Sequence, residues 1–435
     1  MRRRWRKGIR EYSWARLGGD AAGGAAAALI ALPYGLAMAA LMGLPPLFGV
    51  LTSILSCPLL VLFGRNPVLI GGVSSVTVPF IAAAVRHQGI AGAAKVSISA
   101  GIIMMGFCVL RLGRHVSRVP PLVVAGFSCG IGGMMVISQM PAMLGLRPPS
   151  GGWDTRMVGE LFQVALQVGH SQFVPAALAA VVLAVATWVA LRSPKIPALL
   201  CGVVVSILVA RICGWHEKQV GTLSVELAPF AGFRWEPSDF WTVLPEALGL
   251  AFVTSVNLLL TSRVIVHFRG RQRHFKKHDA DMEVGAYGIA NLFLGTFGVP
   301  PSVGIPARSI ANVQCGATTR LSNLFHGVFL LGFLLLGARF IAQIPLAALA
   351  GVTAYTGVRL LEWSTWRRLP HMGRVDAAAF IATAFAVLLV NAIAAVAIGC
   401  SFYLLRGLWH RMTAGPKVLV GDPAQAEAQV GSTRR

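Results

Sequence analysis

An arginine inside apolar sequence is the strongest sign of chemistry in this chain. Arg308 lies in the stretch from Gly298 to Asn312, whose three prolines and two glycines cannot continue a regular helix. An arginine within a membrane span costs several kcal/mol and marks either a functional site or an internal ion pair. No Asp or Glu falls centrally in any predicted apolar span, since Glu246 and Glu283 lie at span ends. The pattern therefore favours a role for Arg308 in binding an anion or in setting the electrostatic field for one.

A second interrupted stretch runs from Gly64 to Val76 in the first half of the chain and includes Ser74 and Ser75. Two interrupted apolar segments in corresponding halves are the best sequence indication of a transporter's binding site. We expect each segment to run extended to mid-membrane and then to begin a short helix, with the two helix N-termini facing each other. Such ends offer unpaired N–H groups and positive dipole ends, which bind anions. The alternative interpretation of the two serines is ordinary helix packing.

Two other spans carry polar residues of interest. Tyr34 lies between Pro33 and Gly35 at a break in the first span, and it either presents its hydroxyl to a cavity or packs against neighbouring helices. Thr254 and Asn257 lie in the eighth span, where Asn257 either hydrogen-bonds substrate or holds two helices together. The residues alone leave these alternatives open.

Composition places the chain among polytopic membrane proteins. Hydrophobic residues make up 55% of the 435 residues, charged residues make up 12%, and the mean hydropathy is +0.69. The net charge of +22 does not indicate nucleic acid, because the basic residues fall in short tracts between apolar spans. The seven cysteines include no CxxC pair, the histidines show no metal-ligand spacing, and no P-loop or catalytic triad appears. We therefore predict no nucleic-acid partner, no metal site, no cofactor and no enzymatic activity.

Apolar runs of about twenty residues predict an all-α membrane protein with fourteen spans, of which the third and tenth are the interrupted ones. The spans lie near 21–42, 45–64, 67–85, 91–110, 119–143, 172–191, 196–214, 242–262, 283–298, 302–314, 321–338, 344–360, 375–390 and 392–408. Fourteen crossings with both termini in the cytoplasm place most Lys and Arg inside, including the cluster from Arg263 to Lys277. The predicted domains are a basic cytoplasmic tail over 1–17, a transmembrane domain over 18–410 and a disordered cytoplasmic tail over 411–435.

From Asp20 to about Leu408 the chain resembles the SulP sulfate permeases and their relatives, the pendrin- and prestin-type anion exchangers. The resemblance rests on several motifs taken together, namely Asp20–Gly24, Ala31–Ala37, Gly43–Gly49, Leu69–Ser75, Gly285–Asn291, Arg308–Asn312 and Ile344–Ala350. It implies a transport domain of two inverted repeats of seven segments, about 18–214 and 242–410, arranged as core and gate domains. It also implies a homodimer that works by elevator-like movement of the core.

The resemblance places the anion between the half-helices of segments three and ten, next to segments one and eight. The site residues it implies are Tyr34, Ser74, Ser75, the N–H of Ala307, Arg308 and the neighbourhood of Asn257. Three positions depart from the family's pattern, which usually has Gln at Tyr34, Pro at Val73 and an acidic residue at Asn257. The missing carboxylate is the natural group for coupling to protons or sodium. The STAS domain that usually follows the last segment is expected to be absent, with Pro416–Val420 as a remnant of its linker.

We therefore predict a secondary transporter of small inorganic anions in the bacterial plasma membrane, working by alternating access in the lipid bilayer. Sulfate is the expected substrate, and bicarbonate or chloride are the alternatives. One rival hypothesis is a nucleobase permease of the same architecture, although such a site needs carboxylates to hold a base. The other is a transport-inactive anion-binding scaffold, which the altered Tyr34, Val73 and Asn257 suggest.

Overall fold

The computed structural model describes residues 13–112, 120–147, 157–193, 196–221, 234–268, 280–390 and 392–413. These ranges are largely helical and contain two strands of two residues each. The predicted basic cluster from Arg263 to Lys277 lies largely outside the described residues. Most of the predicted tails over 1–17 and 411–435, including the predicted linker remnant, also lies outside them.

The first half opens with two long helices and an interrupted segment. Helix α2 (Trp14–Leu41) begins before the predicted span because Ser13 caps it, with the Ser13 hydroxyl accepting from the Arg16 N–H at 3.4 Å. It is followed by α3 (Pro46–Phe63), strand β1 (Gly71–Gly72), the 3₁₀ turn η1 (Ser75–Thr77) and α4 (Val78–Val109). Helix α4 combines part of the predicted third span with the fourth, and it is broken at Gly89, where a φ of 63° and ψ of −149° favour glycine.

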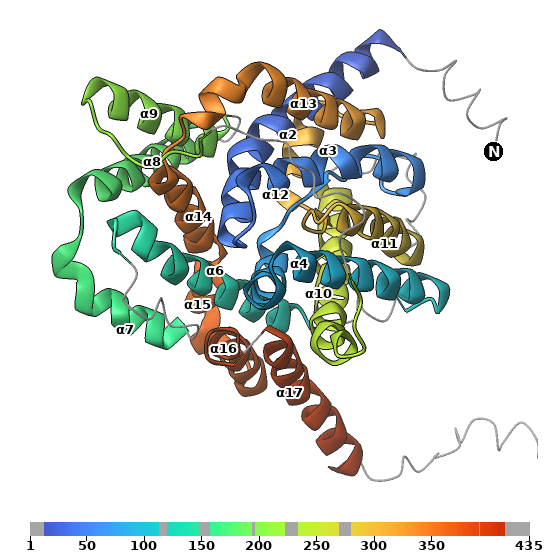
Figure 1. Ribbon diagram of the computed structural model, residues 1–435. Coiled ribbons are helices and arrows are strands. Elements are labelled where there is room, and N and C mark those ends of the chain that lie inside the picture. Colours follow the sequence, from blue (N-terminus) through green and yellow to red (C-terminus); the bar gives the residue numbers. More distant parts are fainter. Residues whose placement is uncertain are drawn as a thin grey trace, which may run out of the picture.

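The second half repeats the order of helix, helix, strand, short helix and long helix. Helices α10 (Asp239–Phe268) and α11 (Ala280–Thr296) lead to strand β2 (Val303–Gly304), the short helix α12 (Pro306–Gln314) and α13 (Leu321–Ala342). The predicted tenth span is therefore the short, interrupted one. These elements and their counterparts in the first half pack on one another, in the upper and right parts of Figure 1. We refer to α2, α3, α4 and α10–α13 as the core group.

The remaining long helices form a second group, which occupies the left and lower parts of Figure 1. We call it the gate group; it contains α6 (Pro121–Leu144), α8 (Phe173–Arg192), α9 (Ala198–Ile212), α14 (Leu346–Leu360), α16 (Arg374–Leu389) and α17 (Ala392–Thr413). Four shorter elements complete the description: α7 (Met157–Gln167), η2 (Val168–His170), α15 (Trp363–Arg368) and η3 (Leu369–His371). The sequence did not predict α7, whose short amphipathic run falls between two predicted spans.

The predicted fold class is confirmed. Each of the fourteen predicted spans corresponds to a helix or to an interrupted segment that enters one. Within the described residues, seven helical segments have the length and apolar character needed to cross a membrane, and two shorter apolar segments lie at Ala198–Ile212 and Ala394–Leu408.

The two interrupted segments meet at the centre of the core group. Strands β1 and β2 pair antiparallel, with Gly71 opposite Gly304 and Gly72 opposite Val303. The Ile305 N–H extends the ladder by donating to the Ile70 carbonyl at 3.0 Å. Because each strand runs into a short helical turn, the antiparallel pairing brings the N-termini of η1 and α12 together from opposite directions. This satisfies otherwise unpaired backbone in the middle of the bundle.

Candidate functional site

Arg308 lies in the first turn of α12 and is buried, with 1% of its surface exposed. Its Nη1 donates to the Ser53 hydroxyl on α3 at 3.1 Å, and its guanidinium carbon lies 5.3 Å from the centroid of the Tyr34 ring on α2. Nε and Nη2 have no hydrogen-bond partner within the part of the chain that the structure describes. A buried cation with unused donors is costly unless a counter-charge reaches it. The two unused donors are therefore the clearest sign of an anion site.

Gly72 provides the space for this arginine. A Cβ atom at position 72 would lie 2.5 Å from the Ser53 hydroxyl oxygen and would collide with Nη1 of Arg308. Only a residue without a side chain lets the guanidinium lie against strand β1 in this position. The glycine that interrupts the third span thus also leaves room for the charged side chain.

The first turn of α12 leaves two backbone donors beside this charge. Pro306 has no N–H, and the first hydrogen bond of the helix runs from the Ser309 N–H to the Ile305 carbonyl at 3.1 Å. The N–H groups of Ala307 and Arg308 come before that bond, so they have no partner within the helix. Pro306 and Ala307 are exposed. The positive end of α12 is therefore accessible to a ligand.

The opposing turn, η1, is neutral and more enclosed. Its first N–H, from Ser75, donates to the Tyr34 hydroxyl at 3.1 Å. The Thr77 N–H and hydroxyl both donate to the Ser74 carbonyl, at 3.2 and 2.7 Å. Ser74 and Ser75 are buried, and the Ser74 side chain does not cap the turn. Tyr34 therefore connects the two halves of the site, since its hydroxyl binds η1 and its ring lies against Arg308.

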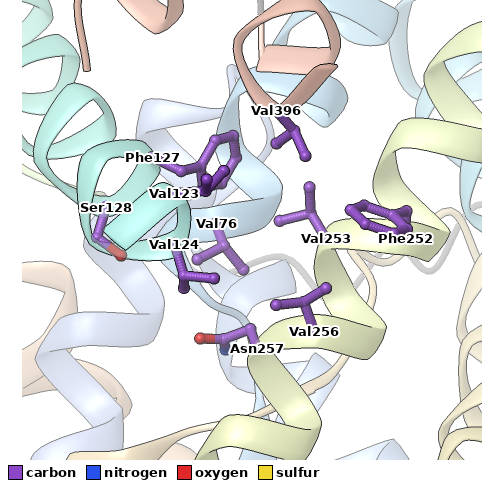
Figure 2. A pocket seen from close by; sticks show the side chains of 10 residues that line it. All are labelled: Val76, Val123, Val124, Phe127, Ser128, Phe252, Val253, Val256, Asn257 and Val396. Atoms are coloured by element: carbon purple, nitrogen blue, oxygen red, sulfur yellow. The ribbon is translucent and has the colours of Figure 1, made fainter. Parts of the chain in front are cut away.

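Asn257 lies on α10 at the edge of this region and hydrogen-bonds backbone. Its Nδ2 donates to the Gly304 carbonyl at 3.3 Å, and the Thr261 hydroxyl, one turn further along, donates to the same oxygen at 3.2 Å. Asn257 also lines an apolar cavity between α10 and the gate group, shown in Figure 2. The other lining residues are Val76, Val123, Val124, Phe127, Ser128, Phe252, Val253, Val256 and Val396. Because Val76 belongs to η1, the cavity adjoins the helical turn that follows strand β1.

The structure places all six predicted site residues around the meeting point of the two segments. Five come together at the two helix ends: Tyr34, Ser74, Ser75, Ala307 and Arg308. Asn257 lies beside them but is bound to strand β2.

Sequence reasoning missed Ser53 and Thr261. Both are hydroxyl residues within apolar helices, and such residues are too common there for either to stand out. Their importance comes from contacts with residues distant in sequence, the arginine for Ser53 and the Gly304 carbonyl for Thr261.

Comparisons with known proteins show the family to which the chain belongs. Residues 17–383 match the sulfate permease family. The bicarbonate transporter BicA of the cyanobacterium Picosynechococcus is 30% identical over 395 residues, which is 88% of this chain and 68% of BicA. The putative sulfate transporter YvdB of Bacillus subtilis is 25% identical over 393 residues, covering 89% of this chain and 73% of YvdB.

Solved structures show the same fold. The transmembrane domain of a cyanobacterial BicA matches with a TM-score of 0.78 and 26% identity, over 89% of this chain and 98% of that domain. The structure of SLC26A9 matches with a TM-score of 0.82 and 18% identity, over 92% of this chain and 67% of SLC26A9. The predicted inverted-repeat architecture is thereby confirmed. The chain is a multi-pass membrane transporter of anions, not an enzyme, and it belongs to the sulfate permease family.

Proposed function

We propose that this protein is a secondary transporter that holds a small inorganic anion between the N-termini of η1 and α12. The observation that carries the proposal is Arg308, which is buried at the meeting point of the two segments with two donors unused. An anion there would accept from the guanidinium and from the N–H groups at the start of α12. The dipole of α12 would add to the attraction.

The arrangement of the helices supports alternating access. The core group and the turn η1 within it supply every proposed site residue, whereas the gate group supplies the other wall of the apolar cavity through Val123, Phe127 and Val396. Apolar side chains at this boundary make no directional bonds that would hold the two groups in one position. We infer that the core group, with the anion, moves past the gate group.

Sulfate and bicarbonate are the two substrates to compare first. The family is named for sulfate permeases, whereas the relative BicA is named for bicarbonate. One arginine and a set of N–H groups distinguish anions by size and hydration rather than by a unique hydrogen-bonding pattern. Sulfate remains our first proposal, followed by bicarbonate and chloride.

We infer that transport is exchange or facilitated diffusion, without coupling to a proton or sodium gradient. Among the described contacts, Asn257 donates its amide to Gly304, and no carboxylate contacts Arg308. A neutral amide neither binds a cation strongly nor carries a proton at physiological pH. The site therefore offers a fixed positive charge and no ionisable partner for a driving ion.

We further propose a homodimer in the bacterial plasma membrane, with both termini in the cytoplasm and repeats of about 18–214 and 242–410. Two exposed cysteines test the orientation: Cys213 follows α9, and Cys315 follows α12. A membrane-impermeant maleimide should label Cys213 in intact cells and should reach Cys315 only after permeabilisation. The reverse pattern would invert the proposed topology.

Uptake into proteoliposomes tests the function. Radiolabelled sulfate and bicarbonate should each be measured with competing anions, with uracil, and with and without imposed proton or sodium gradients. We expect saturable, gradient-insensitive anion flux that Arg308→Glu abolishes. Gradient-driven flux would contradict the proposed lack of coupling, and uracil uptake would support a nucleobase permease. Anion binding without flux would instead identify a transport-inactive scaffold.

A further inference from the structure

Each interrupted segment is held at both ends by side chains of the opposite half of the chain. The loop that enters the first segment receives Glu283 of α11, whose Oε2 accepts from the N–H groups of Arg65 and Asn66 at 2.6 and 2.9 Å. The loop that enters the second segment receives Thr52 of α3, whose hydroxyl donates to the Pro300 carbonyl at 3.0 Å. The second helix of each half thus holds the entry to the other half's segment.

The end of each interrupted segment is also held by the opposite half of the chain, through an aspartate near the start of that half's first helix. Asp20 of α2 is buried, and its Oδ1 accepts from the N–H groups of Thr318 and Thr319 at 2.7 and 3.0 Å. The Thr319 hydroxyl donates to Oδ2. These threonines lie between α12 and α13, where the chain leaves the second interrupted segment.

Asp239, the first residue of α10, holds the exit of the first segment. It is 3% exposed, and its Oδ2 lies 2.7 Å from Nζ of Lys95 while its Oδ1 accepts from Gln88 Nε2 at 3.1 Å. Gln88 and Lys95 lie on either side of Gly89, the break within α4. Asp239 therefore corresponds to Asp20 in both its position in the repeat and the kind of break that it holds.

The breaks that the two aspartates hold lie near opposite ends of α2. Asp20 is in the second turn of that helix, whereas Gly43, just beyond its other end, lies against Val85, one turn before Gln88. The breaks that the aspartates hold are therefore at opposite ends of the core group, with the paired strands β1 and β2 between them. The start of α4 connects η1 to the break that Asp239 holds, and α12 comes directly before the turn that Asp20 holds.

We propose that Asp20 and Asp239 are positioning residues that keep the N-termini of η1 and α12 opposed by fixing each half's interrupted segment to the first helix of the other half. Each aspartate therefore acts on the other half of the chain. Loss of Asp239 loosens the first interrupted segment, and loss of Asp20 loosens the second; we call this crosswise loosening. A buried carboxylate that only stabilises its own helix would have no such effect on the other half. The link to anion affinity rests on the function proposed above, whereas the crosswise loosening does not.

Hydrogen exchange followed by mass spectrometry tests the crosswise effect in the full-length protein in lipid nanodiscs, without added anion. In Asp239→Asn we expect amide exchange over residues 71–95, which include β1 and η1, to rise about tenfold, because a hydrogen bond to a charged group is lost. Exchange over residues 305–319 should stay within about twofold by the same reasoning. Asp20→Ala, or the milder Thr319→Val should Asp20→Ala fail to fold, should give the reverse pattern.

A matched control comes from the gate group, where Asp376 Oδ1 accepts from the Tyr403 hydroxyl at 2.6 Å. Asp376→Asn should leave exchange in both interrupted segments unchanged. Exchange that rises equally in both segments, or only within the helix that carries the substitution, would overturn the proposal. Lys95→Met removes the ion pair from the α4 side and leaves Asp239 in place, so it should raise exchange over residues 71–95 as Asp239→Asn does. Unchanged exchange there in a folded Lys95→Met protein would count against the positioning role.

Anion affinity provides the second readout. If the proposed site is correct, Asp20→Ala and Asp239→Asn should raise KM for the transported anion more than they lower kcat, whereas Asp376→Asn should not raise KM. If the variants show crosswise loosening but an unchanged KM, Asp20 and Asp239 position the interrupted segments, and the proposed location of the anion is refuted. Unchanged exchange in both variants would refute the positioning role whatever the anion.

Discussion

The two interrupted segments have the same backbone plan but different chemistry. Each consists of a two-residue strand followed by a helical turn, and the strands pair with each other. The second segment ends in a regular helix with an exposed N-terminal turn and the buried charge of Arg308. The first enters the regular helix α4 through a neutral 3₁₀ turn whose leading N–H is already bound to Tyr34.

This difference indicates a division of roles. In the proposed site the second segment supplies the attraction, because a full charge and a helix dipole act there together. The first segment supplies shape, since Gly72 leaves room for the guanidinium and Tyr34 fixes the position of η1. A substitution that removes the charge of the second segment and one that alters the shape of the first should therefore have effects on anion transport that differ in size and kind.

The largest effect is expected from Arg308→Glu, which replaces the attraction with repulsion. We expect anion uptake to fall at least about 100-fold, since a reversed charge in a desolvated site costs several kcal/mol. The matched control is Arg359→Gln, because Arg359 also lies over a tyrosine ring, that of Tyr355, at 5.9 Å but is exposed. Normal uptake by folded Arg308→Glu protein, measured in proteoliposomes, would end the proposed role of this charge.

A smaller loss is expected from Gly72→Ala, which changes shape in the first segment and leaves every charge in place. The new Cβ would push Nη1 of Arg308 from its position, and we expect affinity to fall about tenfold or more, as overpacking typically costs 1–3 kcal/mol. Gly106→Ala is the control, because nothing lies within 4 Å of a Cβ there. Equal anion affinity of the two variants by isothermal titration would show that the fit around Arg308 is unimportant.

Tyr34→Phe should have a moderate effect, because it keeps the ring against Arg308 and removes only the acceptor for the Ser75 N–H. We expect KM to rise about three- to tenfold, which corresponds to the loss of one hydrogen bond. Tyr355→Phe removes a 3.5 Å bond to the Ala186 carbonyl in the gate group and should leave KM unchanged. A larger effect at Tyr355 than at Tyr34 would contradict the division of roles.

Asn257→Asp should alter the coupling of transport to an ion gradient more than it alters the affinity for the anion. A carboxylate cannot donate to the Gly304 carbonyl, and it would place two oxygens beside that carbonyl and the Thr261 hydroxyl. Oxygen ligands of this kind attract a proton or a hard cation. We expect flux in this variant to respond to a sodium or proton gradient, whereas Thr261→Val should leave flux gradient-insensitive. Gradient-dependent flux in the unmodified protein would show that coupling uses another group.

The smallest effect concerns pH and the pair of Asp239 and Lys95. The Glu236 backbone N–H, followed by Lys95, lowers the pKa of Asp239 from 3.8 to about 2. A lowered pKa means that the ionised carboxylate stabilises the folded protein above pH 3.8 and that this contribution disappears as the pH falls towards 2. Thermal stability in nanodiscs should therefore show no step from the Asp239 carboxyl group between about pH 5 and 8. A transition in that range that Asp239→Asn removes would contradict the lowered pKa.

Much of this architecture was predictable because it depends on local properties of the chain. Apolar run length gives the spans, and proline and glycine density gives the two interruptions, since neither requires knowledge of distant residues. The break at Gly89 falls between the predicted spans 67–85 and 91–110, in agreement with the prediction. The start of α2 was predicted too late, since Ser13 begins the helix before the apolar run.

The amino-acid sequence by itself determined the fold class, the two interruptions and the unusual placement of Arg308. Tertiary structure alone decided which residues meet, because these contacts join distant parts of the chain. The guanidinium of Arg308 reaches Ser53 across 255 positions, and the Asp20 carboxylate reaches Thr318 across 298. Hydropathy is a local property, whereas a hydrogen bond depends on how two helices pack, and that is settled only when the two halves fold together.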